Sequence, residues 1–355
     1  MSITQVAKLA GVSTATVSRV INESPNVSPD AVRIVLEVIE RLNYRPRRKR
    51  KRRVEPRDRG TRSLAVLALV MPGVRVGFFP SLIQSFDAAA AEFAHQVMTC
   101  NTDNSSTKQA DVILHLIEKR VAGVALMPTS VGPPPAHHVR NLQNAGIPVV
   151  LLHRGIEGVS VPLLALPYEE IANRAVTALY EVGHTRVAAI FSHDGAVTSQ
   201  YKRGLIRALE DHETELPGEL VHFGSAGITG AIDEEHEAGV EAAVIRMLDL
   251  PPQRRPTGFF VPWESDAELV YFLLTSLGVR VPEDVSLITF GSSWRDSSIC
   301  RRMCAITVNE TEVGRMAAQL LVSMASGDES HESQRRLTIP LGFHEGKTLA
   351  PLSAR

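Results

Sequence analysis

The first 44 residues follow a helical pattern of apolar and polar positions. Apolar side chains recur at helical spacing in three short segments, residues 6–10, 14–22 and 29–42. Gly11 lies between the first two segments and suits a turn that needs positive φ, and Ser13 is a good cap for the second helix. Ser28 and Pro29 offer a cap and a first-turn proline to the third. The pattern therefore predicts three short helices.

Beyond Leu64, continuous apolar runs alternate with amphipathic helical segments. Such runs are typical of strands that are buried on both faces of a parallel sheet. We expect strands at residues 64–70, 97–100, 124–127, 148–152, 187–191, 258–261 and 285–290. We expect helices at residues 78–95, 107–120, 136–145, 168–182, 199–211, 238–248, 266–277 and 312–325. This alternation predicts right-handed βαβ units, and its length predicts an α/β body with two doubly wound parallel-sheet lobes.

Charge divides the chain into the same two parts. Residues 1–62 hold 15 lysines and arginines and six acidic residues, a net charge of +9, whereas residues 63–355 carry −10. The formal net charge of −1 therefore conceals a basic head on an acidic body. Every position from Arg45 to Arg53 except Pro46 is basic, and such a run is expected to stay extended without a polyanion.

Composition excludes several classes of protein. No run of about 18 apolar residues is long enough to span a membrane, and the first residues lack the pattern of a signal peptide. The three cysteines, Cys100, Cys300 and Cys304, are too few for a disulfide framework and have no partner at zinc-ligand spacing. We therefore expect a cytoplasmic protein that uses no metal and no cofactor.

Residues 6–22 have the layout of a helix-turn-helix, in which the second helix enters the major groove of DNA. The candidates for base contacts are Thr14, Ala15 and Arg19. Arg19 can bind O6 and N7 of guanine in bidentate fashion, and the other two can offer methyl contacts to thymine. Short polar side chains are candidates for phosphate contacts: Ser13, Thr16, Ser18, Asn22 and Ser28. The alternative is a three-helix cap with a purely structural role.

The helix-turn-helix and several later segments resemble the LacI/GalR family of bacterial transcriptional regulators. The match begins in residues 6–22 and continues in Val27–Pro29, Leu42–Pro46, Cys100–Asp103, Gly146–Val150, Val182–Val187 and Leu277–Ser286. The resemblance implies an all-α head, a hinge, and two lobes of periplasmic-binding-protein type joined by three crossovers. It also implies a homodimeric repressor that binds pseudo-palindromic operator DNA and responds to a small molecule held between the lobes.

The resemblance also divides the chain into domains. We expect the DNA-binding domain at residues 1–46, a basic hinge at 47–62, and an effector-binding and dimerisation domain at 63–353. Within the last domain, the N-lobe is expected at residues 63–163 and 307–326, and the C-lobe at 164–306 and 336–353.

The expected hinge departs from the family pattern. That pattern is a short helix with a leucine that inserts into the minor groove, whereas residues 47–53 are all basic and contain no leucine. We expect the segment to follow phosphates or to place side chains in a narrow minor groove, through Arg47, Arg48, Lys49 and Arg50. The alternative is a solvated linker.

The expected effector pocket departs further. Where family members often carry arginine, amide or carboxylate side chains, this chain has His153, Tyr201, Trp263, Glu264 and Gly291. The loss of several such groups argues against a typical sugar ligand. The candidate lining residues are Phe78, Phe79, His153, Arg154, Tyr201, Trp263, Glu264 and Trp294. Aromatic side chains with histidine and arginine favour a ring-bearing or anionic ligand; the alternative for each is core packing or surface exposure.

No segment has the spacing of a common catalytic motif. Gly342–Thr348 has three residues between its glycines where a P-loop has four, and neither Gly-x-Ser-x-Gly nor His-Glu-x-x-His occurs. We therefore expect a regulator that is not an enzyme. Two alternatives stay open: a DNA-binding regulator whose lobes only dimerise or recruit a protein partner, and an α/β enzyme fused to a DNA-binding head.

Overall fold

The structure of this chain is a computed structural model that describes residues 3–21, 28–41, 65–73, 79–130, 132–225, 234–293, 297–327 and 336–352. The chain divides into two compact units, Met1–Arg62 and Ser63–Arg355, which we call the head and the body and describe separately. Among the helices in these ranges, none is long and apolar enough to cross a membrane.

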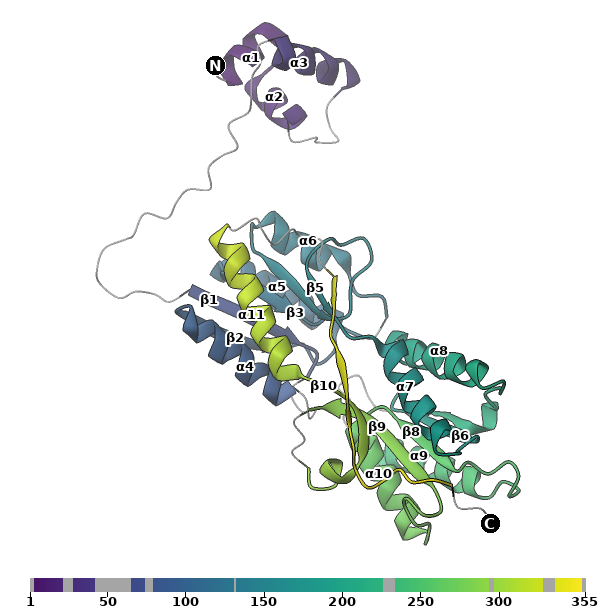
Figure 1. Cartoon of the computed structure of the whole chain (residues 1–355). Coiled ribbons are helices and arrows are strands. Elements are labelled where there is room, and N and C mark those ends of the chain that lie inside the picture. The colour runs from purple at the N-terminus through teal and green to yellow at the C-terminus, as the bar shows by residue number, and fades with distance from the viewer. Residues whose placement is uncertain are drawn as a thin grey trace. The chain divides into compact units, whose positions relative to one another are not determined.

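The described residues of the head form three helices, α1 (Ile3–Ala10), α2 (Thr14–Ile21) and α3 (Pro29–Arg41) (Figure 1). Gly11 adopts the predicted positive φ, 66°, between the first two. Ser13 caps α2, because its hydroxyl accepts a 3.0 Å hydrogen bond from the backbone N–H of Thr16. The inner faces of the helices share a core of small apolar side chains: Val6, Ala7, Ala10, Val17, Val20, Val35 and Val38.

In the part of the body that the structure describes, the strands form two six-stranded sheets, one in each lobe (Figure 1). The N-lobe strands are β1 (Ala65–Met71), β2 (His95–Asn101), β3 (Gly123–Leu126), β4 (Val149–His153), β5 (Leu163–Ala165) and β11 (Arg336–Thr338). The C-lobe strands are β6 (Val187–Phe191), β7 (Val221–Phe223), β8 (Gly258–Val261), β9 (Ser286–Ser292), β10 (Cys304–Val308) and β12 (Leu341–His344). The spatial orders are β11-β5-β4-β3-β1-β2 and β12-β10-β9-β8-β6-β7.

Helices cover the sheets of both lobes. The N-lobe has α4 (Phe79–Glu92), α5 (Ser106–Lys119), α6 (Ala136–Asn144) and α11 (Glu310–Ser326). The C-lobe has α7 (Tyr168–Glu181), α8 (Ala196–Asp211), α9 (Glu234–Leu248) and α10 (Glu264–Ser276), with 3-10 helices η1 (Gly218–Leu220) and η2 (Cys300–Arg302). Every residue of β3, β4, β6, β8 and β10 is buried, as the continuous apolar runs require.

The predicted fold class is confirmed, with one addition. The strand pairs of the described body are parallel except β10 with β12, which are antiparallel with Val308 opposite Leu341. Five short strands were not predicted from the sequence: β5, β7, β10, β11 and β12. The glycine-containing stretch from Gly342 begins inside β12, so it forms part of an edge strand rather than a phosphate-binding loop.

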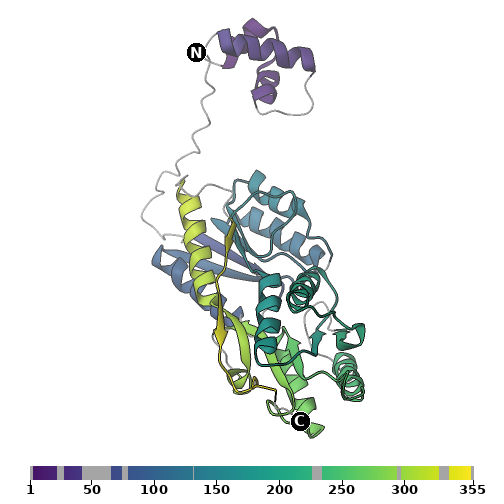
Figure 2. The same ribbon diagram turned by 45° about the vertical axis from the view of Figure 1, so that its right-hand side comes forward.

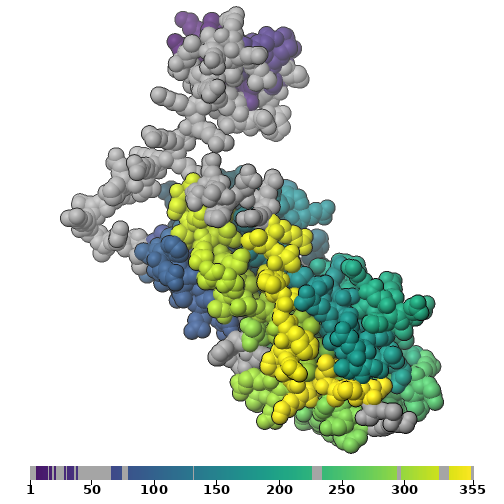
Figure 3. Space-filling model, viewed as in Figure 1, coloured from purple at the N-terminus to yellow at the C-terminus, as the bar shows by residue number. Residues whose placement is uncertain are grey.

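Three chain segments connect the lobes, as the family resemblance implies. The first leads from β5 to α7 through Leu166 and Pro167. The second is Asn309, between β10 and α11, and the third leads from β11 to β12 through Ile339 and Pro340. Figures 1 and 2 show the third running along both lobes beside α11, and Figure 3 shows this C-terminal stretch on the surface.

Two glycines allow neighbouring helices to pack so closely that their backbone atoms are in contact. At Gly204 in α8, an added Cβ atom would lie 1.9 Å from the backbone oxygen of Glu169 in α7. At Gly314 in α11, it would lie 2.5 Å from the backbone oxygen of Leu82 in α4. Neither glycine has positive φ, so space rather than backbone conformation excludes a side chain. These contacts hold α7 against α8 and α11 against α4.

We expect Gly204→Ala to destabilise the body by about 1–3 kcal/mol or more, because the new methyl group meets backbone atoms that cannot rotate away. Urea unfolding followed by circular dichroism measures the change. The matched control is Gly218→Ala, where an added Cβ has no neighbour within 4 Å and the effect should stay within about 0.5 kcal/mol. A Gly204→Ala protein as stable as the control would show that α7 and α8 are not held this tightly.

Candidate functional site

The residues predicted to contact DNA gather on and before α2. Thr14, Ala15 and Arg19 lie in α2 together with Thr16 and Ser18, while Ser13 and Ser28 directly precede α2 and α3. Ser13 and Thr14 are exposed, and the hydroxyl of Ser13 lies 2.9 Å from that of Thr16. Several predicted site residues lie outside the described residues: Asn22, Arg47, Arg48, Lys49, Arg50, Phe78 and Trp294.

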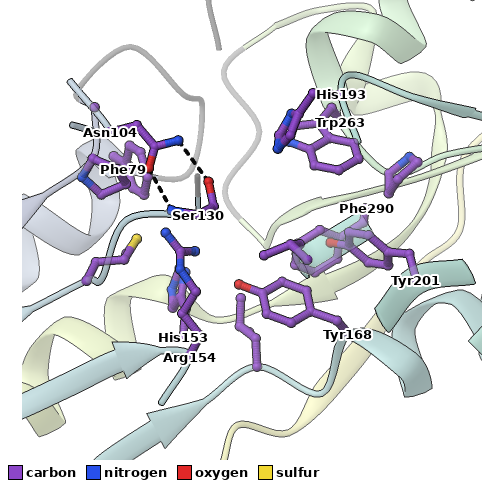
Figure 4. Close-up of a pocket in the computed structure, with 16 residues that line it drawn as sticks. Phe79, Asn104, Ser130, His153, Arg154, Tyr168, His193, Tyr201, Trp263 and Phe290 are labelled. Atoms are coloured by element: carbon purple, nitrogen blue, oxygen red, sulfur yellow. Dashed lines mark hydrogen bonds between the residues drawn. The ribbon is translucent and has the colours of Figure 1, made fainter. Parts of the chain in front are cut away.

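A cavity of about 120 Å³ lies between the two lobes of the body (Figure 4). Its N-lobe side is lined by Pro72, Gly73, Phe79, Asn104, Met127, Ser130, His153, Arg154 and Leu166. Its C-lobe side is lined by Tyr168, His193, Val197, Tyr201, Pro262, Trp263 and Phe290. Most of these residues lie at the carboxyl ends of parallel strands, where ligand sites form in such sheets. Five residues predicted from the sequence are brought together here: Phe79, His153, Arg154, Tyr201 and Trp263.

His153 and Glu310 form a buried pair beside the cavity. His153 ends β4 with a φ of 65° and is 2% exposed, and Glu310 is the fully buried first residue of α11. The Nε2 atom of His153 lies 3.2 Å from Oε1 of Glu310. The N-terminus of α11 also favours a carboxylate at this position. The pair therefore joins the N-lobe sheet to the helix that follows the second crossover.

Arg154 extends its guanidinium group toward the cavity from the N-lobe (Figure 4). One of its N–H groups donates to the backbone carbonyl of Pro128. Burial raises the pKa of the neighbouring Tyr168 hydroxyl, and the charge and hydrogen bond of Arg154 lower it in part. The Nε atom of Arg154 is buried and has no hydrogen-bond partner among the described residues. Arg154 thus brings a positive charge with an unused donor to the cavity.

Asn104 and Ser130 join two N-lobe loops at the edge of the cavity. The side-chain oxygen of Asn104 accepts a 2.8 Å hydrogen bond from the backbone N–H of Ser130, and its Nδ2 donates to the Ser130 hydroxyl at 2.8 Å (Figure 4). Asn104 has a φ of 55°, which an asparagine tolerates better than most residues. The pair therefore holds the loops after β2 and β3 in one arrangement.

Tyr201 is the centre of an aromatic cluster on the C-lobe side. Its ring contacts Tyr168 at 5.3 Å and Trp263 at 5.5 Å between centroids, both near edge-to-face, and it lies 6.4 Å from Phe290. The ring of His193 lies 5.6 Å from that of Trp263. Burial raises the pKa of Tyr201 well above its usual value. The phenol is therefore neutral, and the cluster presents an uncharged aromatic wall.

His193 brings unused polar atoms to the same cavity from the C-lobe. Both of its ring nitrogens are buried and have no hydrogen-bond partner among the described residues. Burial is the main cause that lowers the pKa of His193; the carboxylate of Asp266 opposes this, and the charge on Arg154 adds to it. Two smaller effects act on the same pKa: the nearby Asp194 raises it and the nearby His236 lowers it. His193 is therefore a neutral imidazole that can donate one hydrogen bond and accept another.

A buried polar network holds His193 and Trp263 in place. Asp266, at the start of α10, accepts a hydrogen bond from the hydroxyl of Ser192, and its Oδ1 lies 3.2 Å from Nε2 of His236. All three side chains are at most 5% exposed. Because Ser192 precedes His193 and Asp266 lies one turn from Trp263, the network fixes the segments that carry both lining residues.

Glu264 does not line the cavity, although it directly follows Trp263. Its carboxylate occupies the space beside Gly291, where an added Cβ atom would lie 2.2 Å from Oε1 of Glu264. The glycine in β9 therefore makes room for this side chain, which is not among the residues that line the cavity. Tertiary packing directs two neighbouring residues to different places.

Sequence reasoning missed five lining residues that bear on the chemistry: Asn104, Ser130, Tyr168, His193 and Phe290. Asn104, Ser130 and His193 follow the carboxyl ends of strands that were predicted, so the general rule for parallel sheets could have found them. Tyr168 follows β5, a three-residue strand that the pattern does not reveal. Among the described residues, no group of three or more His, Cys, Asp or Glu side chains is placed to hold a metal ion.

Comparisons with known proteins match both parts of the chain. Residues 2–47 match the family described as bacterial regulatory proteins, lacI family, and residues 176–349 match the periplasmic binding protein-like domain. Catabolite control protein A of Priestia megaterium is 27% identical over 348 residues, which cover 97% of this chain and 98% of the relative. The HTH-type transcriptional repressor PurR of Aliivibrio fischeri (strain MJ11) is 27% identical over 334 residues, 93% of each chain.

A solved structure supports the same fold. The lac repressor dimer, bound to operator and the anti-inducer ONPF, matches with a TM-score of 0.65 at 18% identity and covers 99% of each chain. At this identity the likeness establishes the architecture of a helix-turn-helix region followed by two α/β lobes.

We expect His193 to contribute to a loss of stability in acid. Since its folded pKa lies below the unfolded value near 6.5, the unfolded chain binds a proton that the folded chain does not, and stability falls as pH decreases below about 6.5. His193→Gln should flatten this dependence by at most about 1.4 kcal/mol per pH unit, measured by urea unfolding at pH 7.5, 6.5 and 5.5. His115→Gln, at an exposed histidine, is the control. An unchanged slope in His193→Gln would contradict this assignment.

Proposed function

Because the chain belongs to the LacI family of bacterial regulatory proteins, we propose that it is a dimeric repressor whose binding to operator DNA is controlled by a small molecule between its lobes. The observation that carries the proposal is the presence, on one chain, of a lacI-family head and of a cavity lined from both lobes of the body. Arg154 and His193 have buried nitrogens without a partner among the described residues, which favours a bound ligand over lobes that only dimerise.

The head supplies the contacts to DNA. Two protomers present two α2 helices to the half-sites of a pseudo-palindromic operator, one helical turn or a multiple apart. In each half-site, bases are read by Thr14, Ala15 and Arg19, and phosphates are bound by Ser13, Thr16, Ser18, Asn22 and Ser28. The basic hinge adds contacts through Arg47, Arg48, Lys49 and Arg50.

The body regulates the binding of the heads to DNA. A ligand that contacts both lobes stabilises one arrangement of them, and that arrangement changes the spacing of the two heads. The proposed domains are residues 1–46 for DNA binding, 47–62 for the hinge and 63–353 for ligand binding and dimerisation. The proposed function includes no catalytic activity. A protein that binds operator DNA is found at the nucleoid in the bacterial cytoplasm.

Selection of bound duplexes from a random pool by the full chain tests the proposal. We expect the selected duplexes to share a pseudo-palindrome of two half-sites, because a symmetric dimer reads the same sequence twice. A single, asymmetric half-site would contradict the dimeric mode, and the absence of any shared sequence would contradict specific recognition.

We expect Arg19→Ala to relax base preference at one position of each half-site and to weaken operator binding by about 1–3 kcal/mol per half-site, since a bidentate contact to guanine is lost. Gel-shift titration against operators changed at each base pair measures both effects. Arg33→Ala is the control, because this exposed side chain is already paired with Glu37 at 3.4 Å. Equal weakening on every sequence would instead make Arg19 a phosphate contact.

We expect replacement of residues 47–53 by serine and alanine to reduce the salt dependence of operator binding. Each lost phosphate contact should lower the slope of log K against log salt by about 0.9. Fluorescence anisotropy with labelled operator at several salt concentrations gives the slope. A slope equal to that of the unaltered protein would identify the segment as a solvated linker.

A further inference from the structure

The lining of the cavity is poorly suited to a polyhydroxylated ligand. Sugar hydroxyl groups call for carboxylate and amide partners, yet no Asp or Glu is among the described lining residues. Asn104, the amide in this set, already uses its oxygen and one N–H on Ser130. The nearby carboxylates of Asp266 and Glu310 are each bonded to a buried histidine. A ligand that suits this cavity therefore carries few hydroxyl groups that need carboxylate or amide partners.

The size of the cavity sets a second limit. Its volume is about 120 Å³. An apolar protein cavity of about 150 Å³ is known to hold a benzene molecule. This volume is slightly smaller than that of the benzene-binding cavity, so the space between the lobes is on the scale of a single six-membered ring rather than a disaccharide or a nucleoside.

Aromatic side chains reach this space from both lobes. Phe79 contributes from the N-lobe, while Tyr201, Trp263 and Phe290 contribute from the C-lobe (Figure 4). Tyr201 contacts Trp263 near edge-to-face and packs at a tilt against Phe290, so the C-lobe rings offer a packed surface to an incoming ring. Aromatic pairs in such arrangements are stabilised beyond the effect of apolar burial alone.

The polar groups that remain unused favour an anion. The positively charged Arg154 has a buried Nε without a partner among the described residues, and the His193 ring presents two such nitrogens from the opposite lobe. Arg154 and His193 line the same cavity from opposite lobes, and the charge on Arg154 helps to lower the pKa of His193. A carboxylate between them would accept hydrogen bonds from both, and bonds to charged donors are the stronger kind.

We propose that the inter-lobe cavity binds a small single-ring aromatic carboxylate, with its ring between Phe79 and Trp263 and its carboxylate between Arg154 and His193. This inference rests on the proposed function, which makes the cavity the effector site, and names the chemical class of the effector. Because ring and carboxylate each contact both lobes, the ligand holds the lobes together. An uncharged ring or an aliphatic acid would form only part of these contacts.

Calorimetric titration of the full chain with four probes tests the ligand class. Benzoate should bind, benzamide and cyclohexanecarboxylate should bind at least about tenfold more weakly, and glucose should give no heat of binding. Benzamide as tight as benzoate would overturn the anionic assignment, and cyclohexanecarboxylate as tight as benzoate would overturn the aromatic one. Binding of glucose alone, or of none of the four, would overturn the proposal as a whole.

Two variants test where the carboxylate of the ligand binds. Arg154→Met should weaken benzoate by about tenfold or more while leaving benzamide within about twofold, because only the charged contact is lost. Arg140→Met is the control, since this exposed arginine donates to Gly158 outside the cavity. His193→Phe removes the ring nitrogens from the other lobe and covers the case in which Arg154→Met fails to fold. Folded variants that keep the benzoate-to-benzamide ratio of the unaltered protein would overturn the proposed placement.

Operator binding with and without benzoate separates this inference from the function on which it rests. Benzoate that binds the chain but leaves operator affinity unchanged supports the ligand class and contradicts the effector role. Benzoate that does not bind, in a chain whose operator affinity responds to another small molecule, overturns the ligand class and leaves the regulatory function intact.

Discussion

The close packing of α7 against α8 is the contact on which the cavity depends. It exists because Gly204 leaves no side chain where the backbone oxygen of Glu169 approaches. Tyr201 lies almost one turn before Gly204, and Tyr168 is the first residue of α7, so the same packing brings their rings together at 5.3 Å. Trp263 then packs on Tyr201. The contact between the two helix backbones therefore brings the rings of Tyr168, Tyr201 and Trp263 together on the C-lobe side.

The carboxylates near the cavity pack against other protein groups and are not among the residues that line it. A buried carboxylate is stable only when donors surround it, and Asp266 has Ser192 and His236 as partners. Glu310 is paired with a histidine at the start of α11. The carboxylate of Glu264 fills the space that Gly291 leaves open. The groups left to meet a ligand are therefore aromatic, neutral or positively charged, although the body as a whole is acidic.

The sequence predicts the fold better than it predicts the site. β6 and β8 agree residue for residue with the expected strands, because fully buried strands leave a continuous apolar run. β5 and the tyrosine that follows it escape prediction, because three residues are too short a run. Trp263 and Glu264 are adjacent in sequence, yet only Trp263 lines the cavity, since the space beside a glycine in β9 accepts Glu264. His153 was predicted to line the cavity and does so, but the sequence pattern does not predict its left-handed backbone.

The cavity is linked to the connections about which the lobes can move. Tyr168 directly follows the first crossover and receives the hydrogen bond of Arg154, while His153 is paired with Glu310 just after the second. The N-lobe loops are tied by the Asn104–Ser130 pair, and α11 packs closely against α4, so the N-lobe resists internal change. A ligand that alters the separation of the lobes must therefore do so at crossovers of one or two residues. Since the first crossover adjoins lining residues and the second adjoins the partner of His153, binding and lobe arrangement are coupled through direct contact rather than through a long pathway.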